Sequence, residues 1–261
     1  MYTFSSKLKT FSIVLMILGL LGIGYGFLTA PKTIEEVEVI LSEQHHDGHG
    51  AHDAHAAPAH HADAKDAHAE VSHDDAHQKH LEHVYHQLAN KPWAAVYVGC
   101  IFFMFIALGI FTFNQIQYAA SAGWSPVLFR VMEGLSAYLL PGSVLFFLLL
   151  LASAGHLNHM FIWMDADVVA NDPIIQGKAA FLNIPFFLIR AVIFLAGWNI
   201  FRILSRRNSL ALDETGDLSY YKKNFKLAAG YLVFFIITES IMSWDWIMSI
   251  DTHWYSTLFG W

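Results

Sequence analysis

The sequence predicts an all-α, polytopic membrane protein, with one N-terminal anchor helix followed by an antiparallel bundle of four transmembrane helices. Hydrophobic residues make up 55% of the 261 residues and charged residues only 14%, a balance too apolar for an ordinary soluble domain. A helix needs about 20 mostly apolar residues to cross a bilayer. Five stretches meet this requirement, at residues 11–29, 93–120, 126–154, 179–205 and 225–250.

Three segments follow from the distribution of polar and apolar residues. Residues 1–30 are interpreted as a retained anchor helix, because the apolar run is longer than the roughly 7–15 residues of a secretory signal. Residues 31–91 are polar, and residues 92–261 hold the four-helix bundle. The single cysteine, Cys100, lies in an apolar stretch, which excludes a disulfide framework or a cysteine-based metal site.

The polar segment carries 13 of the 16 histidines. Its middle is of low complexity and is not expected to fold. Histidines recur every three residues from His77 to His86, which indicates a short surface helix that ends at Pro92. For the histidine-rich middle we favour a solvated, pH-responsive tether over a metal-collecting loop. The formal net charge of −7 is concentrated in this segment, and nothing in the sequence indicates nucleic-acid binding.

The distribution of basic residues predicts the orientation in the membrane, because cytoplasmic loops carry an excess of Lys and Arg. Nine basic residues share one side if all five spans are real: Lys7, Lys9, Arg130, Arg202, Arg206, Arg207, Lys222, Lys223 and Lys226. The N-terminus is therefore expected in the cytoplasm. The histidine-rich segment, the loop at 156–172 and the end near Asp251 are expected on the outer side.

Acidic residues inside the last span need an explanation, because a central acid costs roughly 2.5–3.5 kcal/mol on insertion scales. At 1.5 Å per residue, Arg190 and Glu239 both lie roughly 14–16 Å deep, and we expect them to face each other. Asn183 and Ser243 extend this polar seam, and Asp245 follows in the same span. A structural ion pair and part of a proton path that opens outward are the two interpretations.

A second set of candidates lies at the outer end: His156, His159, Asp165, Asp251 and His253. A histidine beside an acid near the bilayer surface could accept the proton released when a quinol is oxidised. Ordinary interfacial polar residues and a metal site are the alternatives, although no tight ligand motif is present. No histidine lies at mid-membrane and CxxCH is absent, so we expect no haem on this chain.

A third set lies near the expected cytoplasmic side. Arg130 and Glu133 are three residues apart on one helix face and are expected to pair. Asn114, Gln115 and Gln117 are polar residues near the same end. The cytoplasmic half of a proton route through Glu133 is the alternative to a simple structural pair.

The stretch SIDTHWYSTLFGW at 249–261, which follows MSWDW, resembles a known family. It is similar to the second polytopic, quinone-binding-type membrane subunit of bacterial alternative complex III, related to the polysulfide-reductase (NrfD-like) subunits. The resemblance extends over spans two to five. It implies a ten-helix protein of the bacterial cytoplasmic membrane, of which this chain would supply the first helix and the first bundle.

The resemblance also implies a function and a set of partners. These are haem- and iron–sulfur-bearing subunits, a sister subunit that binds menaquinone or ubiquinone, and cytochrome c or a terminal oxidase as the electron acceptor. The sister subunit has an HLGR motif at its quinol pocket, whereas this chain reads His156-Leu157-Asn158-His159. That departure favours a structural or proton-conducting role, with no redox cofactor on this chain. A docking scaffold and a metal or solute transporter remain the alternatives.

Overall fold

A computed structural model describes residues 5–47, 73–256 and 258–260, and helices dominate these residues. Five helical stretches are long and apolar enough to cross a membrane, which confirms the prediction from the sequence. They are Ser6–Thr29, Val84–Ala119, Ser125–Ala154, Ile184–Thr215 and Ser219–Ile250. The chain divides into two compact units, Met1–Trp93 and Ala94–Trp261.

The first unit contains helix α1 (Ser6–Thr29), helix α2 (Ile34–Asp47) and the beginning of helix α3 (His73–Ala119). Ser5 caps α1 by accepting a hydrogen bond from the amide of Leu8. None of the α1 side chains is buried, so its apolar residues are exposed around the whole helix. A helix that is apolar on every side needs an apolar environment, which suits a membrane anchor.

Two expectations for the polar segment need correction. Helix α2 was not expected, and its Val37 is fully buried. Pro92 does not end the histidine-bearing helix, because α3 continues through it to Ala119. A proline removes one backbone hydrogen bond, a loss that a long apolar helix can tolerate. The low-complexity residues 48–72, and with them most of the tether hypothesis, lie outside the described residues.

The second unit contains the rest of α3, the remaining α-helices and several short 3-10 helices. After α3 come η1 (Ser125–Leu128), α4 (Phe129–Leu135), η2 (Ser136–Tyr138), α5 (Leu139–Ala154), η3 (Ile162–Met164), α6 (Ala166–Asn171), α7 (Pro173–Lys178), α8 (Ile184–Thr215), α9 (Ser219–Trp246) and η4 (Met248–Ile250).

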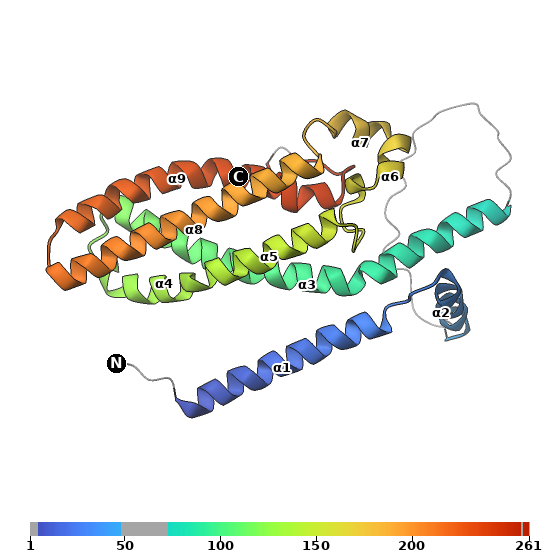
Figure 1. Ribbon diagram of the computed structural model, residues 1–261, viewed down its shortest axis with the longest axis horizontal. Coiled ribbons are helices and arrows are strands. Elements are labelled where there is room, and N and C mark those ends of the chain that lie inside the picture. Colours follow the sequence, from blue (N-terminus) through green and yellow to red (C-terminus); the bar gives the residue numbers. More distant parts are fainter. Residues whose placement is uncertain (1–4, 48–72, 257, 261) are drawn as a thin grey trace. The chain divides into compact units, whose positions relative to one another are not determined.

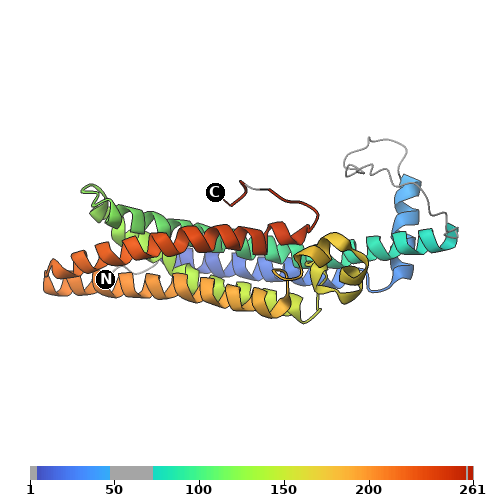
Figure 2. The same cartoon turned by 90° about the horizontal axis from the view of Figure 1, so that it is seen from above.

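The spans expected at residues 179–205 and 225–250 leave a loop of about 20 residues between them, and this loop is absent from the structure. Helix α8 runs to Thr215 and α9 begins at Ser219, which leaves only residues 216–218 as the connection. Gly216 ends α8 in the left-handed conformation (φ 68°), which glycine adopts without steric cost. Helices α8 and α9 form an extended helical hairpin and lie side by side in both views (Figures 1 and 2).

One hydrophobic core is shared by α3, α5, α8 and α9. Its centre is aromatic, with Phe146, Trp198 and Trp246 fully buried and their rings in contact. Two hydrogen bonds join α3 to α9 inside this core: Tyr97 donates to the carbonyl of Trp246 at 2.7 Å, and Thr112 bonds Tyr231 at 2.7 Å. These bonds therefore hold α9 in register with α3 near its middle and at its C-terminal end.

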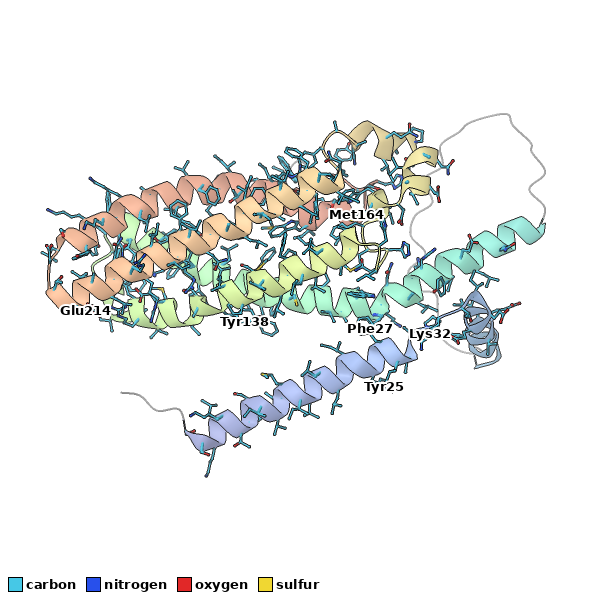
Figure 3. The ribbon with its side chains drawn as sticks, viewed as in Figure 1. Tyr25, Phe27, Lys32, Tyr138, Met164 and Glu214 are labelled. Atoms are coloured by element: carbon cyan, nitrogen blue, oxygen red, sulfur yellow. The ribbon has the colours of Figure 1, made fainter. Side chains whose placement is uncertain are left out.

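The long helices of this unit have two distinct ends. Met164 lies at one end and Glu214 at the other (Figure 3). We refer to them as the Met164 end and the Glu214 end. The Met164 end holds η3, α6, α7 and the segment after α9, whereas the Glu214 end holds the α8–α9 connection.

Gly197 allows α8 and α9 to approach closely, because a Cβ at this position would overlap the ring of Phe234 on α9. We predict that Gly197→Ala lowers the free energy of unfolding by about 1–3 kcal/mol, the usual cost of overpacking. Gly109→Ala on α3 is the matched control, since its Cβ would meet no atom within 4 Å. Thermal unfolding in detergent measures both; equal melting temperatures would contradict the close packing.

Candidate functional site

The central feature of the site is a buried ion pair between α8 and α9. Arg190 Nε donates to Asp245 Oδ2 at 2.6 Å, and Arg190 Nη2 donates to Asp245 Oδ1 at 2.6 Å. Asp245 is fully buried and Arg190 is 6% exposed. Two parallel hydrogen bonds of this kind form the strongest arrangement that arginine and a carboxylate can adopt.

Further contacts hold the guanidinium in place. Nη2 also donates to the carbonyl of Phe181 at 3.1 Å, and the group lies over the rings of Phe181 and Phe186 at 4.1 and 4.4 Å. Such cation–π contacts stabilise a desolvated arginine. Its remaining nitrogen, Nη1, is buried and has no hydrogen-bond partner among the described residues. The guanidinium is thus held by Asp245, by the Phe181 carbonyl and by two aromatic rings, and both N–H donors of Nη1 are left over.

The predicted pairing of Arg190 with Glu239 is wrong. Glu239 is half-buried, and its side chain forms no hydrogen bond or ion pair within the described part of the chain, whereas Asp245 binds the arginine. The buried face of α9 includes Tyr231, Thr238 and Asp245, which recur every seven residues. Glu239 is one residue further round the helix than Thr238 and so leaves this face.

Asn183 and Ser243 do not extend a continuous polar seam. Asn183 is the N-cap of α8, and its Oδ1 accepts a hydrogen bond from the amide of Phe186 at 3.0 Å. Ser243 is buried and donates to the carbonyl of Ser240 on its own helix at 2.7 Å. Both side chains stabilise local structure, so the predicted seam reduces to the pair of Arg190 and Asp245.

Three of the residues that were predicted at the outer end come together at the Met164 end. His159 Nδ1 lies 3.0 Å from Asp165 Oδ2, and His156 Nδ1 lies 3.5 Å from Asp165 Oδ1. His156 adopts a positive φ of 57°, which is uncommon for a residue with a side chain. One carboxylate therefore faces two imidazoles, as the histidine-and-acid interpretation requires.

The other two predicted residues belong to a separate pair. His253 Nε2 lies 2.7 Å from Asp172 Oδ2, while Asp251 only accepts hydrogen bonds from the amides of His253 and Trp254. Asp172 also caps α7. Partial desolvation opposes ionisation, but hydrogen bonds from the amides of Ile174 and Ile175 and the nearby His253 lower the pKa of Asp172 below its ordinary value.

Sequence reasoning missed Asp172 as a site residue, although a signal was present. An aspartate directly before a proline is typical of a helix start, and here Asp172 precedes Pro173, the first residue of α7. No three or more His, Cys, Asp or Glu side chains are arranged to hold a metal ion within residues 5–47, 73–256 and 258–260.

A buried acid forms a second centre at the Glu214 end. Glu133 is 4% exposed, and its Oε2 accepts from Arg130 Nη1 at 2.6 Å, which confirms the predicted pair, and from Arg206 Nη1 at 3.2 Å. Arg130 also bonds Asp213 and the carbonyl of Ser209. Glu133 Oε1 is buried without a partner among the described residues. From the sequence, Arg206 is expected only to contribute to the orientation of the chain in the membrane, and its contact with Glu133 is an addition from the structure.

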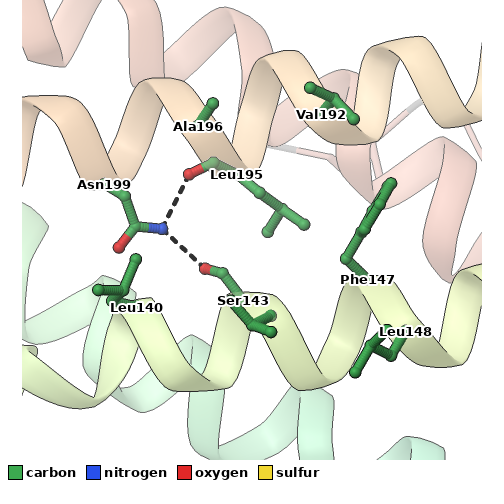
Figure 4. Close-up of a pocket in the computed structure, with 9 residues that line it drawn as sticks. Leu140, Ser143, Phe147, Leu148, Val192, Leu195, Ala196 and Asn199 are labelled. Carbon is green, nitrogen blue, oxygen red and sulfur yellow. Dashed lines mark hydrogen bonds between the residues drawn. The ribbon is translucent and has the colours of Figure 1, made fainter.

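Polar side chains lie between these two centres. Gln115 on α3 donates to Ser205 on α8 at 3.2 Å, and Asn199 on α8 donates to Ser143 on α5 at 2.9 Å (Figure 4). Asn199 and Ser143 border a cavity of about 320 Å³ whose other lining residues are apolar. Buried oxygens without a hydrogen-bond partner among the described residues occur on Asn114, Gln115 and Asn199. Such atoms can accept hydrogen bonds from water.

Comparison with known proteins does not identify a family for this chain. No known protein-family model matches the chain, and no curated protein matches it at a significant level.

We predict that Asp245→Asn lowers the free energy of unfolding by about 3–5 kcal/mol, because it leaves the buried Arg190 charge uncompensated. Glu239→Gln is the matched control on the same helix and is expected to change it by less than about 1 kcal/mol, because Glu239 has no ion-pair partner in the described structure. Unfolding in mild detergent checks both. Equal effects of the two substitutions would contradict the assignment of the pair.

Proposed function

We propose that this chain is an integral membrane subunit of a bacterial respiratory quinol oxidoreductase of the alternative complex III type. In this proposal the helices of the second unit form an antiparallel four-helix bundle, one half of a ten-helix protein, with the Met164 end facing the periplasm. The N-terminus then lies in the cytoplasm. The resemblance at 249–261 and the nine basic residues expected on the cytoplasmic side support this arrangement.

The proposed partners carry the redox chemistry. Haem- and iron–sulfur-bearing subunits transfer the electrons, and a sister polytopic subunit oxidises menaquinone or ubiquinone. Cytochrome c or a terminal oxidase accepts the electrons. The chain itself holds helices and protonatable groups in position while cofactors on neighbouring subunits do the electron transfer.

The observation that carries the proposal is the charged pair buried between two apolar helices. Ionisable groups inside membrane-spanning segments are costly to insert. They are rare, and they typically mark proton and ion pathways, which a simple anchor does not need. Asp245, held by Arg190, forms the outer station of the proposed proton route. Glu133, with one oxygen free of hydrogen bonds in the described structure, forms the inner station.

The side chains between the stations suit proton transfer through water. Asn199, Ser143 and Gln115 offer amide and hydroxyl groups along α8, α5 and α3. Asp165 with its two histidines, and Asp172 with His253, form the outer mouth, where imidazoles exchange protons near neutral pH. Glu239 stays a second candidate carrier, because it is an acid within a membrane-spanning helix and has no ion-pair partner among the described residues.

We predict that Glu133→Gln in the purified, reconstituted complex lowers the number of protons translocated per electron and leaves quinol oxidation within about twofold of the wild type. The reason is that glutamine keeps the shape and accepts hydrogen bonds but cannot carry a proton. Glu214→Gln, at an exposed acid near the same end, is the matched control. Stopped-flow measurement of external pH during turnover gives the ratio. An unchanged ratio in Glu133→Gln would remove the inner station.

One observation favours a purely structural docking role as the second candidate. The Arg190–Asp245 pair is closed, with both carboxylate oxygens bonded to the guanidinium. Simultaneous replacement of Arg190 and Asp245 by leucine distinguishes the two functions. Normal turnover with normal proton translocation would support the scaffold, and retained turnover with lost translocation would support the route.

A metal or solute transporter with a histidine-rich collecting loop is the remaining alternative, and residues 48–72 lie outside the described structure. The proteins that co-purify with the chain in mild detergent separate it from the other two. Haem-bearing partners support a respiratory subunit, and their absence favours transport.

A further inference from the structure

A second cavity lies at the Met164 end, beside the Arg190–Asp245 pair, because Phe181, whose carbonyl accepts a hydrogen bond from Arg190, lines it. Its volume is about 490 Å³, within the range of small-molecule sites. One wall comes from the connection between α7 and α8, with Gly177, Lys178 and Phe181. The opposite wall comes from the end of α9 and the segment that follows it, with Trp244 and Trp254.

The cavity combines aromatic walls with one cationic donor. Lys178 Nζ donates to the carbonyl of Thr252 at 2.5 Å, and no acid lies within ion-pair distance of it in the described structure. An ammonium group has three N–H donors, so two remain for a ligand. Thr252, which also lines the cavity, is 2% exposed, and its hydroxyl has no hydrogen-bond partner among the described residues.

The surroundings of the cavity are apolar. Trp244 is 37% exposed, Trp254 44% and Tyr255 77%, and all three line it. Tryptophan and tyrosine with one apolar and one polar side are typical of the boundary between lipid tails and headgroups. A molecule that fills this cavity therefore meets a cation at its polar end and membrane at its apolar end.

We propose that this cavity binds the headgroup of a membrane amphiphile, with an oxygen of the headgroup accepting hydrogen bonds from Lys178 and the aliphatic tail passing Trp244 into the bilayer. Two sources share this chemistry: a phospholipid, through a phosphate or ester oxygen, and an isoprenoid quinone, through a ring carbonyl. The proposal does not depend on the respiratory function, because either amphiphile is present in a bacterial membrane.

Two substitutions test the site in different ways. Lys178→Met removes the donors and keeps an aliphatic side chain of similar length. Gly177→Leu places an apolar side chain at a residue that lines the cavity, where a Cβ would meet no atom within 4 Å and is not expected to disturb the packing. The matched controls are Lys223→Met on α9 and Gly123→Leu after α3, where a Cβ also meets no atom within 4 Å.

The full-length chain is purified in mild detergent with its native partners and washed free of bulk lipid. Bound lipid is then extracted and analysed by mass spectrometry. The amount of phosphorus measures phospholipid, and the absorbance of the ring measures quinone. We expect about one retained amphiphile per chain and about tenfold less in Lys178→Met, the effect of losing a charge-assisted hydrogen bond. Gly177→Leu is expected to give a similar loss, and both controls retain the lipid.

The arms of the experiment separate the outcomes. Loss of phosphorus alone identifies a phospholipid, and loss of ring absorbance alone identifies a quinone. Equal retention of both lipids by wild type, Lys178→Met and Gly177→Leu would overturn the proposal. If Lys178→Met proves unstable, Gly177→Leu decides the question, since it leaves Lys178 and its bond to Thr252 in place.

Discussion

The ion pair between Arg190 and Asp245 is the constraint on which the second unit depends. Removing an arginine and an aspartate from water is costly, and only close hydrogen bonds and opposite charge offset that cost. The guanidinium on α8 therefore requires the carboxylate on α9 at one particular depth and rotation. Trp198 of α8 and Trp246 of α9 also meet, and Tyr97 of α3 donates a hydrogen bond to the carbonyl of Trp246. The ion pair thus sets the register of α8 against α9, and the hydrogen bonds of Tyr97 and Thr112 set that of α3 against α9.

Charge is distributed unevenly along these helices. The pair of Arg190 and Asp245 lies toward the Met164 end, and Glu133 with Arg130 and Arg206 lies toward the Glu214 end. Amide side chains lie between them, and Gln115 and Asn199 bond a neighbouring helix or their own backbone. This pattern stabilises the packing of apolar helices and also supplies the groups that the proposed proton route would use.

The spans could be predicted from the sequence because a bilayer imposes both length and apolarity, and those properties are visible without a structure. The partner of Arg190 was mispredicted because the fourth span was expected to begin at residue 179, whereas α8 begins at Ile184. Arg190 therefore lies nearer the end of its span than expected, at a depth that matches Asp245 and not Glu239. The seven-residue spacing of Tyr231, Thr238 and Asp245 also indicates that Asp245 lies on the buried face of α9. The extension of α8 beyond the apolar stretch could not be predicted from hydropathy, because polar residues such as Arg206 and Asp213 end an apolar run without ending a helix.

A double-mutant cycle tests the central claim most directly. The first cycle compares the free energies of unfolding of the wild type, Arg190→Leu, Asp245→Leu and the double variant. A parallel cycle replaces Asp245→Leu by Glu239→Leu. The structure predicts a coupling energy of about 1–3 kcal/mol between Arg190 and Asp245, and additive effects for Arg190 and Glu239. Additive effects in the first cycle, or equal coupling in both, would contradict the assignment of this pair as the contact that holds the helices together.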